Sequence, residues 1–276
     1  MKKTIVITGA SDGIGAQAAR QLKAKGHQVV LVGRSKAKTE SLAKELDSPF
    51  HLADYTDLSD VRRLADELMA YDRIDVLANN AGGIMGDRVV TKDGFEKTFQ
   101  VNHLAPFLLT HALLDKLIDS SAVVIQTSSI AANIFGLGFD VADLNNERQY
   151  QSQKAYGHGK LANILFTREL DRRFRDQGIK AVAFHPGVVR SSFASDTNHF
   201  LHYAYHTPLK YLVTISPAQS ARRLVALVDG EPGKDWILGE VYDKSMPMKV
   251  KFKDDGSVAR ALWEQSEKMV SGSQVQ

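Results

Sequence analysis

The chain of 276 residues contains no cysteine. This absence excludes disulfide bonds, thiolate nucleophiles and cysteine-ligated metal sites, and it fits a reducing cytoplasm. An excess of one charge sign is also lacking, because 35 basic and 32 acidic residues are interspersed, so no basic stripe favours nucleic acid as a partner. No stretch approaches the roughly 18 uninterrupted apolar residues of a membrane-spanning helix. We therefore expect a cytoplasmic protein without an integral membrane segment.

The chain does contain enough apolar material for one large core. Hydrophobic residues make up 43% of it and charged residues 24%, and no low-complexity tract interrupts it. A chain of this length buries one sizeable core and is too short for several full domains. We expect residues 1–276 to form a single domain.

A strand, a glycine-rich turn and a helix follow one another near the N-terminus. Residues 4–8 are mostly β-branched and lack polar alternation, which is typical of a strand buried on both faces of a parallel sheet. In the turn, Gly9 permits a tight bend, Gly13 lets the backbone approach a pyrophosphate, and Gly15 lets the helix pack on the strand. The order predicts a dinucleotide-binding turn, with a purely structural glycine turn as the alternative. Its expected cofactor-binding residues are Gly9, Ser11, Asp12, Gly13, Ile14 and Gly15.

The end of the next strand, residues 28–32, bears on the choice of cofactor. In dinucleotide-binding folds an acidic residue here holds the 2′-hydroxyl of NAD, whereas an arginine accepts the 2′-phosphate of NADP. Gly33 stands where the acid would be, and Arg34 and Ser35 follow it. We expect these two residues to bind NADP(H), with NAD(H) and an ordinary surface arginine as the alternatives. Asp12 counts against this preference, because a basic residue in the glycine turn would have helped bind the phosphate.

Two further strand ends carry polar residues. Asp54 ends the segment that starts at Phe50, where it could accept a hydrogen bond from the adenine amino group; capping the next helix is the alternative role. The strand at residues 74–78 runs into two asparagines and small residues, a composition that suits close approach of the backbone to a ligand but is also common in turns. From this run we expect Asn80, Ala81 and Gly82 to contact the cofactor.

Tyr156 precedes Lys160 by four residues in a stretch that favours helix. Four residues is about one helical turn, so both side chains leave the same face. A phenol has a reference pKa of about 10, and a nearby ammonium favours the phenolate, so the pair suits proton transfer to a carbonyl oxygen. This spacing also arises by chance in many proteins of this size.

Together these motifs resemble the short-chain dehydrogenase/reductase family. The resemblance rests on the glycine turn at residues 8–15, the NNAG run at 79–82, the YxxxK run at 156–160 and Pro186-Gly187 after a later strand. Residues 101–110 and 155–163 are most similar to the retinol dehydrogenase-like group, which includes WW-domain oxidoreductases and protochlorophyllide reductases. The resemblance implies a single α/β domain with a Rossmann-type, doubly wound parallel sheet of about seven strands and helices on both faces.

The resemblance also implies a catalytic set. Tyr156 would exchange a proton with the substrate oxygen, and Lys160 would lower the pKa of Tyr156 and hold the nicotinamide ribose. Ser129, the second serine of a Ser-Ser step that ends the fifth strand, would donate a hydrogen bond to the same oxygen. Asn102 would position a water that relays protons from Lys160. An extra loop at residues 140–146 lengthens the interval from Ser129 to Tyr156 to 27 residues.

Beyond Tyr156, the family pattern implies a nicotinamide-binding turn and a substrate lid. Residues 1–190 would form the cofactor-binding and catalytic core, 191–235 the lid, and 236–276 the last strand and a tail that favours an amphipathic helix. Aromatic residues in the lid suit a lipophilic or ring-bearing substrate, or packing against the core or another subunit. His199, His202 and His206 have the spacing of metal ligands in a helix, but no carboxylate or other supporting partner is evident, so we expect no metal. The turn would contact the carboxamide through Val189 and Ser191, and Pro186 and Gly187 would also bind the cofactor.

We therefore expect an NADP(H)-dependent oxidoreductase that acts on a small-molecule carbonyl/alcohol pair. Two alternatives remain from the sequence: reduction of an activated C=C bond, as in the protochlorophyllide branch, and a non-catalytic NADP-binding regulatory protein. A homo-oligomer stays open, since the family includes monomers, dimers and tetramers.

Overall fold

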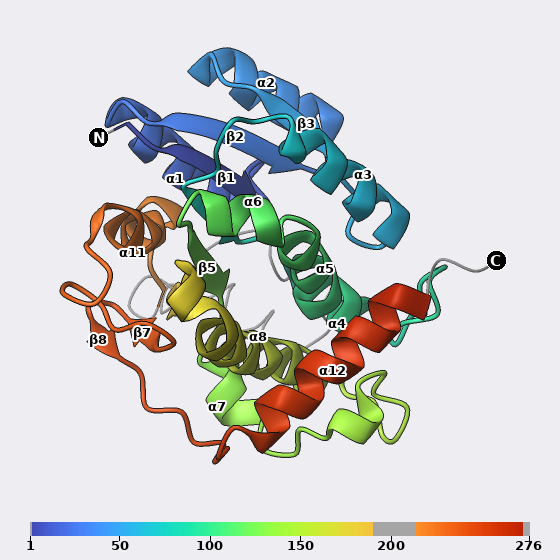
Figure 1. Ribbon diagram of the computed structural model, residues 1–276. Helices are drawn as coiled ribbons and strands as arrows, with labels where there is room; N and C mark the ends of the chain where they lie inside the picture. Colours follow the sequence, from blue (N-terminus) through green and yellow to red (C-terminus); the bar gives the residue numbers. More distant parts are fainter. Residues whose placement is uncertain (1, 190–213, 273–276) are drawn as a thin grey trace.

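The computed structural model describes residues 2–189 and 214–272 (Figure 1). Ser191 and the lid's predicted aromatic and histidine residues between 193 and 211 lie outside the described residues. Within the described ranges, one sheet has the strand order β3-β2-β1-β4-β5-β6-β7-β8. The strand bounds are β1 Thr4–Thr8, β2 Gln28–Gly33, β3 Phe50–Leu52, β4 Val76–Asn79, β5 Val123–Thr127, β6 Lys180–His185, β7 Val241–Asp243 and β8 Met246–Pro247.

The sheet is parallel from β1 to β7, as predicted, and β8 is a short antiparallel addition to its edge. Along β1, Ile5 and Ile7 join one apolar core, while Val6 joins the other. Both faces of the central strands are therefore buried, which explains why their sequences lack polar alternation. The sequence analysis missed β8, because two residues are too few to show a periodicity.

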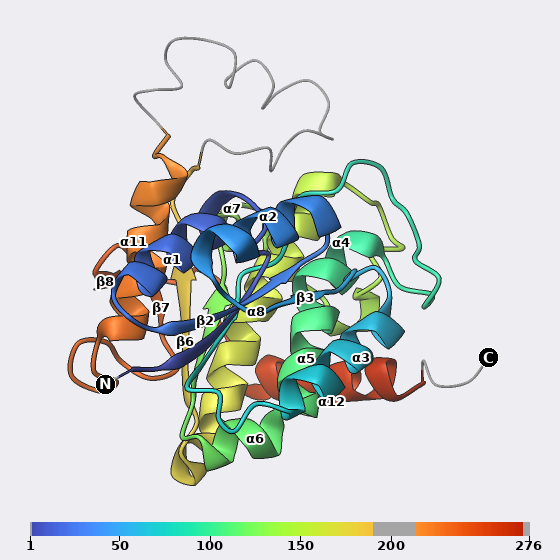
Figure 2. The same cartoon turned by 90° about the horizontal axis from the view of Figure 1, so that it is seen from above.

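Helices cover both faces of the sheet, so the doubly wound prediction is confirmed. Figure 2 shows α1 and α11 on one side, and α3 and α5 on the other. Residues 217–229, within the predicted lid at 191–235, form α11 and pack on the sheet. No helix of the described ranges combines the length and apolar character needed to span a membrane. The longer helices are α1 Gly13–Ala24, α2 Lys36–Leu46, α3 Leu58–Met69, α5 Ala105–Ala112, α8 Ser152–Phe174, α11 Pro217–Asp229 and α12 Ser257–Gly272; the shorter ones are α4 Lys97–Phe99, α6 Leu114–Asp119 and α7 Ala131–Phe135.

The order of the strands reverses at β1. The chain runs from β1 outward through β2 to β3, then returns to place β4 on the other side of β1. The carboxyl ends of β1 and β4 diverge into opposite crossovers at this point, which leaves a crevice where open α/β sheets bind ligands.

The C-terminal helix α12 packs on α5 and α8 through aromatic side chains. The Phe107 ring on α5 lies 5.5 Å from that of Phe166 on α8 and 5.1 Å from that of Trp263 on α12, measured between centroids. All three side chains are buried. This cluster ties the predicted amphipathic helix of the tail to α5 and α8, the two helices that lead away from the catalytic residues.

Phe107→Ala should lower the free energy of unfolding by about 3–5 kcal/mol, because it removes a fully buried ring that contacts two other aromatic side chains. Met69→Ala on α3 is the control, since the Met69 side chain is 44% exposed, and it should cost less than about 0.5 kcal/mol. Urea unfolding monitored by circular dichroism gives both values. Equal losses in the two variants would contradict the packing described for the cluster.

Candidate active site

A cavity of about 570 Å³ opens at the carboxyl ends of β1, β2 and β4. We call the part lined by Arg34, Asp54 and Tyr55 the β2–β3 end, and the part lined by Tyr156 and Lys160 the α8 end. Gly15, Gly187 and Val189 do not line the cavity, although the sequence assigned them to the cofactor. The predicted cofactor residues that do line it are Gly9, Ser11, Asp12, Gly13, Ile14, Arg34, Ser35, Asp54, Asn80, Ala81, Gly82, Tyr156, Lys160 and Pro186.

Each glycine of the first turn is there for a different structural reason. Gly9 has a φ of 64°, and a Cβ there would lie 2.9 Å from Cα of Ala81. A Cβ on Gly15 would lie 2.3 Å from the carbonyl oxygen of Gly9, so Gly15 serves helix packing. Gly13, with a φ of 54°, begins α1 and lines the cavity. The glycine turn therefore brings the start of α1, whose first N–H groups lack intrahelical partners, to the cavity wall.

Asn80 and Thr8 fasten the ends of β1 and β4 together. The Asn80 side-chain amide donates to the Thr8 carbonyl oxygen at 2.9 Å, and the backbone N–H groups of Asn80 and Ala81 both donate to Thr8 Oγ1 at 3.0 Å. Asn80 is thus used to hold the crevice in shape, in addition to lining it. The sequence analysis gave Thr8 no such role, because the partners lie more than 70 residues apart along the chain.

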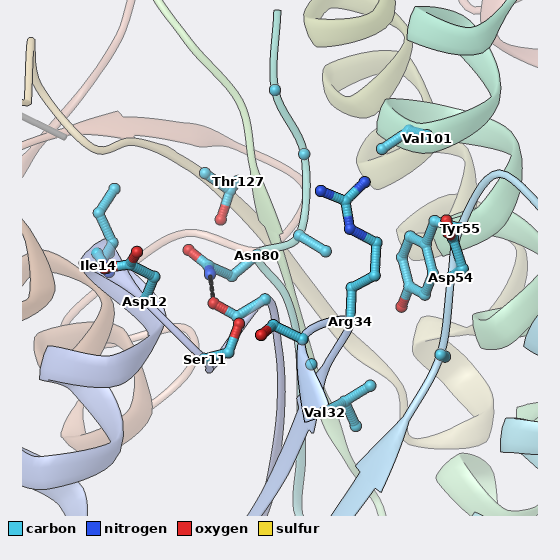
Figure 3. Close-up of a pocket in the computed structure, with 18 of the residues that line it drawn as sticks. Ser11, Asp12, Ile14, Val32, Arg34, Asp54, Tyr55, Asn80, Val101 and Thr127 are labelled. Carbon is cyan, nitrogen blue, oxygen red and sulfur yellow. Dashed lines mark hydrogen bonds between the residues drawn. The ribbon is translucent and has the colours of Figure 1, made fainter. Parts of the chain in front are cut away.

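At the β2–β3 end, Arg34 offers an unpaired cation. Its side chain is exposed and extends into the cavity toward Val101 (Figure 3), and it makes no hydrogen bond or ion pair with the described parts of the chain. A Cβ on Gly33 would lie 2.2 Å from Thr39 Oγ1, so the packing of α2 leaves no room for an acidic side chain at position 33. Ser35 precedes α2 without a side-chain capping bond, which leaves its hydroxyl available beside Arg34.

Asp12, which counted against NADP, is itself paired. Its carboxylate accepts from Lys38 Nζ at 2.6 Å and from the backbone N–H of Gly13 at 2.7 Å. The hydrogen bond from Lys38, and then that from Gly13, lower the pKa of Asp12 below its usual value. The carboxylate therefore caps α1 and has its charge offset by Lys38, a pairing that the sequence alone did not reveal.

Asp54 lines the cavity and does not cap α3. Its Oδ1 accepts from the backbone N–H of Thr56 at 2.9 Å and from the Thr56 hydroxyl at 2.8 Å. Asp57 caps α3 instead, by accepting from the backbone N–H of Ser59. The helix-cap alternative for Asp54 is therefore wrong, and its role toward adenine stays a prediction.

At the α8 end, Tyr156 and Lys160 lie one helical turn apart. Lys160 Nζ is 5.4 Å from the centre of the Tyr156 ring and donates to the Thr127 carbonyl oxygen at 3.1 Å. Only 2% of Lys160 is exposed, and no carboxylate of the described chain pairs with it. Burial lowers the pKa of Lys160 to about 7. An anionic group brought next to it would therefore gain more stabilisation than it would beside an exposed lysine.

Asn102 sits in a π-helical turn, Gln100–Leu104, between α4 and α5. Its Nδ2 donates to the carbonyl oxygens of Thr98 and Gly83, both at 2.8 Å, and its Oδ1 accepts from the N–H of Gly83 at 3.1 Å. The side chain thus takes the Thr98 carbonyl that a regular helix would bond through its backbone. A Cβ on Gly82 would lie 2.6 Å from Asn102 Oδ1 and 3.1 Å from Lys160 Nζ, so these side chains meet across this glycine. The helix is therefore irregular at Asn102, and the water relay stays a prediction.

The two serines after β5 have different partners. Ser128 is fully buried and its hydroxyl donates to the Lys160 carbonyl oxygen at 2.8 Å. Ser129 is 9% exposed and its Oγ accepts from the backbone N–H of Ala131 at 3.2 Å. Ser129 does not line the cavity. Its hydroxyl proton has no acceptor among the described residues, so it remains able to donate to a ligand.

The predicted nicotinamide turn has a left-handed backbone at Gly187, whose φ of 89° favours glycine. A Cβ there would lie 2.6 Å from Ile215 Cδ1, and Val189 forms a β-bridge with Ile215. These contacts shape the turn, while Pro186 reaches the cavity. Other lining residues, which the sequence did not assign to the cofactor, lie in strands, helices and loops: Val32, Gly33, Lys38, Ala53, Tyr55, Gly83, Ile84, Met85, Lys97, Val101 and Thr127.

The extra loop at residues 140–146 makes two polar contacts with other segments. Asn145 Oδ1 accepts from the backbone N–H of Glu96 at 3.0 Å, and Asn146 Oδ1 lies 3.0 Å from His158 Nδ1 on α8. The loop therefore joins the segment before α4 to the helix that carries Tyr156.

The residues present fit a bound dinucleotide. The cavity has glycine backbone where a Cβ would clash, the positive end of α1, an unpaired arginine at one end and a buried lysine at the other. Such a wall suits an extended ligand with phosphates near α1. Among the described residues no cluster of metal-ligating side chains is found.

The stability of the cofactor-free chain should depend on Lys160 in a defined pH window. Because its folded pKa of about 7 lies below the usual 10.5, the unfolded chain binds more protons between these values, so stability rises with pH there. Relative to Lys160→Met, the wild type should gain up to about 3 kcal/mol between about pH 7 and 9.5. Urea unfolding at several pH values measures this difference. Parallel profiles for the two proteins would show that the folded pKa of Lys160 is not lowered.

Comparisons with known proteins identify the family of the chain. The family model for short chain dehydrogenases matches residues 3–201. Human retinol dehydrogenase 13 is 36% identical over 283 aligned residues, which cover 97% of this chain and 84% of that protein. A Streptomyces protein that carries the name daunorubicin C-13 ketoreductase is 36% identical, over 96% of this chain and 91% of its own.

Among solved structures, an uncharacterised protein from Mycobacterium paratuberculosis superposes with a TM-score of 0.76 at 31% identity, over 98% of this chain and 93% of that one. The fold, the motifs and these relatives lead to one conclusion. The chain belongs to the short-chain dehydrogenase/reductase family, is similar to its retinol dehydrogenases, and is an oxidoreductase that acts on CH–OH or C=O groups with a nicotinamide cofactor.

Proposed function

We propose that the chain is an NADP(H)-dependent enzyme that interconverts a lipophilic or ring-bearing carbonyl compound and its alcohol. The observation that carries the proposal is that Tyr156 and the buried Lys160 share one cavity with the unpaired Arg34. The names of two relatives refer to retinol and daunorubicin, both of which bear rings. The aromatic residues of the sequence between 193 and 211 suit such a substrate as well.

The nicotinamide, when bound, supplies or accepts the hydride. In the direction of reduction, Tyr156 donates its phenolic proton to the substrate oxygen as the carbonyl becomes an alcohol. The ammonium of Lys160 stabilises the phenolate that remains, and the desolvated setting strengthens this attraction. Ser129 donates a hydrogen bond to the same oxygen, where negative charge develops in the transition state. Oxidation of an alcohol uses the same groups in reverse.

Three features at the β2–β3 end support NADP(H) as the cofactor. Within residues 2–189 and 214–272, the Arg34 guanidinium and the Ser35 hydroxyl have no competing partner, and position 33 has no room for the carboxylate that would hold a 2′-hydroxyl. A guanidinium can bind a phosphate through two parallel hydrogen bonds, which an exposed lysine cannot match.

The proposal is tested with a panel of aliphatic, aromatic and polycyclic carbonyl compounds and alcohols, monitored at the nicotinamide absorbance with both cofactors. We expect turnover of lipophilic members of the panel, and a kcat/KM that is higher with NADPH than with NADH. Turnover confined to small hydrophilic substrates would contradict the proposed substrate class, and identification of the products would separate C=O from C=C reduction.

Tyr156→Phe should lower kcat by at least about a thousandfold, because the phenolic proton donor is lost. Binding of NADPH, measured by fluorescence, should stay within about threefold. Tyr71→Phe is the control, because Tyr71 lies near His51 and away from the cavity, and it should retain turnover. Undiminished turnover in Tyr156→Phe would exclude the proposed mechanism.

Arg34→Ala should weaken NADPH by about 10- to 100-fold in Kd and NADH by less than about threefold, because a charge-assisted contact to phosphate contributes roughly 1.5–3 kcal/mol. Arg20→Ala is the control, since the guanidinium of Arg20 is already bonded to Glu45 outside the main cavity. Equal losses for both cofactors in Arg34→Ala would refute the phosphate role.

A further inference from the structure

A buried amide joins the two walls of the β2–β3 end of the cavity. Gln100 lies in the π-helical turn, next to Val101, which lines the cavity, and two residues before Asn102. It is 0% exposed. Its side chain points away from the cavity, into a set of polar contacts between segments that are distant in the sequence.

Every hydrogen-bonding group of the Gln100 side chain is used. Its Nε2 donates to the carbonyl oxygen of Tyr55 at 3.1 Å and to Asp93 Oδ2 at 2.8 Å, and its Oε1 accepts from the hydroxyl of Thr91. A primary amide has two N–H donors and one carbonyl oxygen, and each of these groups has a partner here. We call Gln100 with Tyr55, Asp93 and Thr91 the Gln100 bridge.

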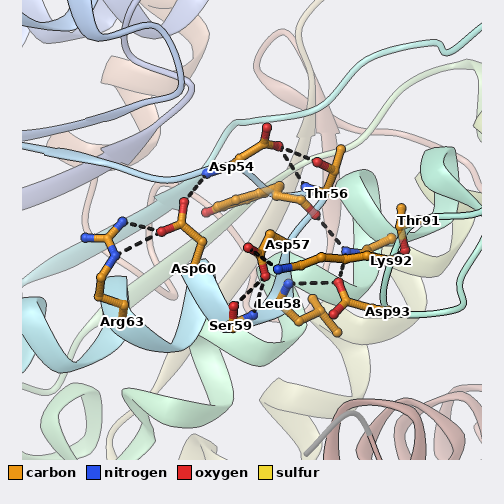
Figure 4. A network of polar contacts seen from close by, with 12 residues as sticks. Asp54, Thr56, Asp57, Leu58, Ser59, Asp60, Arg63, Thr91, Lys92 and Asp93 are labelled. Carbon is orange, nitrogen blue, oxygen red and sulfur yellow. Dashed lines mark hydrogen bonds and ion pairs between the residues drawn. The ribbon is translucent and has the colours of Figure 1, made fainter. Parts of the chain in front are cut away.

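Asp93 extends this bridge to α3. Its Oδ2 also accepts from the backbone N–H of Leu58 at 2.9 Å, at the start of that helix (Figure 4). The neighbouring Lys92 forms an ion pair with Asp57, which caps the same helix. The carboxylate of Asp93 thus sits at a helix N-terminus, where a negative charge is favourable, and holds both α3 and Gln100.

The bridge spans the cavity wall from one side to the other. Asp54 and Tyr55 form one wall of the β2–β3 end, and Val101 belongs to the other. The Tyr55 carbonyl is held by Gln100, and the turn at Asp54 is held separately by Thr56 (Figure 4). One amide side chain that does not itself line the cavity therefore links the two walls.

We propose that Gln100 is a positioning residue that sets the width of the adenosine half of the cofactor site. This inference rests on the proposed function in placing the adenosine half at the β2–β3 end. Loss of the amide removes a hydrogen-bond donor from the Tyr55 carbonyl and from Asp93, and an acceptor from the Thr91 hydroxyl, and such groups rearrange to recover hydrogen bonds. The wall at Asp54 and Tyr55 then moves relative to Val101, while Tyr156 and Lys160 on α8 keep their own contacts.

The test is binding of half-cofactors to the full chain, measured by calorimetry. Adenosine 2′,5′-bisphosphate and AMP report on the adenosine half, and nicotinamide mononucleotide reports on the α8 end. Gln100→Met keeps the length of the side chain and removes the amide. It should weaken both adenosine probes by about tenfold and change the affinity for nicotinamide mononucleotide by less than about twofold.

Two further variants keep the inference falsifiable. Asp93→Ala removes the acceptor that Gln100 and Leu58 share, which lies in a partly exposed loop. It should also weaken the adenosine probes relative to nicotinamide mononucleotide, so it provides the test if Gln100→Met does not fold. Asn133→Leu is the matched control. The buried Asn133 amide donates to the Lys249 carbonyl oxygen and accepts from the Lys251 N–H, both at 2.8 Å, and it does not line the cavity. Its loss should lower stability without changing the affinity for the adenosine probes relative to nicotinamide mononucleotide.

The positioning role would be overturned if Gln100→Met and Asp93→Ala weakened binding of the adenosine probes and of nicotinamide mononucleotide equally, or weakened neither. Failure of the proposed cofactor preference looks different. If the wild type binds AMP as tightly as the bisphosphate, the proposed role of Arg34 toward the 2′-phosphate is lost. The affinities of the wild type and of Gln100→Met for AMP and for nicotinamide mononucleotide still test the role of Gln100. If the wild type binds no adenosine probe, both proposals fall.

Discussion

The α8 end of the cavity is built around a lysine whose amino group is buried without a carboxylate partner among the described residues. Lys160 points its Nζ at a backbone carbonyl, that of Thr127, and burial lowers its pKa to about 7. Holding a cation there is costly unless an anion arrives beside it. The arrangement therefore suits a site in which negative charge appears only during the reaction, on the neighbouring phenol of Tyr156 and on the substrate oxygen.

The residues around Lys160 allow backbone and polar groups to approach its Nζ closely. Gly82 leaves room for Nζ and for the amide of Asn102, and Asn102 bends its helix by taking the Thr98 carbonyl. Ser128 holds the Lys160 backbone through its carbonyl oxygen. A π-helical turn at such a place is a common sign that helix regularity has been exchanged for the placement of a side chain. The same turn carries Val101 and Gln100, so one segment connects the α8 end of the cavity with the β2–β3 end.

Local patterns made much of this architecture predictable. The glycine turn, the strand ends and the Tyr156–Lys160 spacing depend on residues close together in the chain, and the parallel sheet with helices on both faces appeared where they implied it. Contacts between distant segments were not predictable. Asp12 was weighed as an adverse charge because its partner Lys38 belongs to another helix. The contacts of Thr8 and Gln100 gave no signal in the sequence, since they exist only when β4 and the turn before α3 lie beside them.

The central claim is that hydride passes between the nicotinamide and a carbonyl carbon while Tyr156 supplies the proton. Reaction of a lipophilic α,β-unsaturated aldehyde with NADPH carrying deuterium at the transferred position of C4 tests it directly, because this substrate offers both a C=O and a C=C bond. Mass spectrometry and NMR of the product locate the label. We predict deuterium on the carbinol carbon of the allylic alcohol; deuterium on the former alkene carbon, or a product without label, would contradict the account.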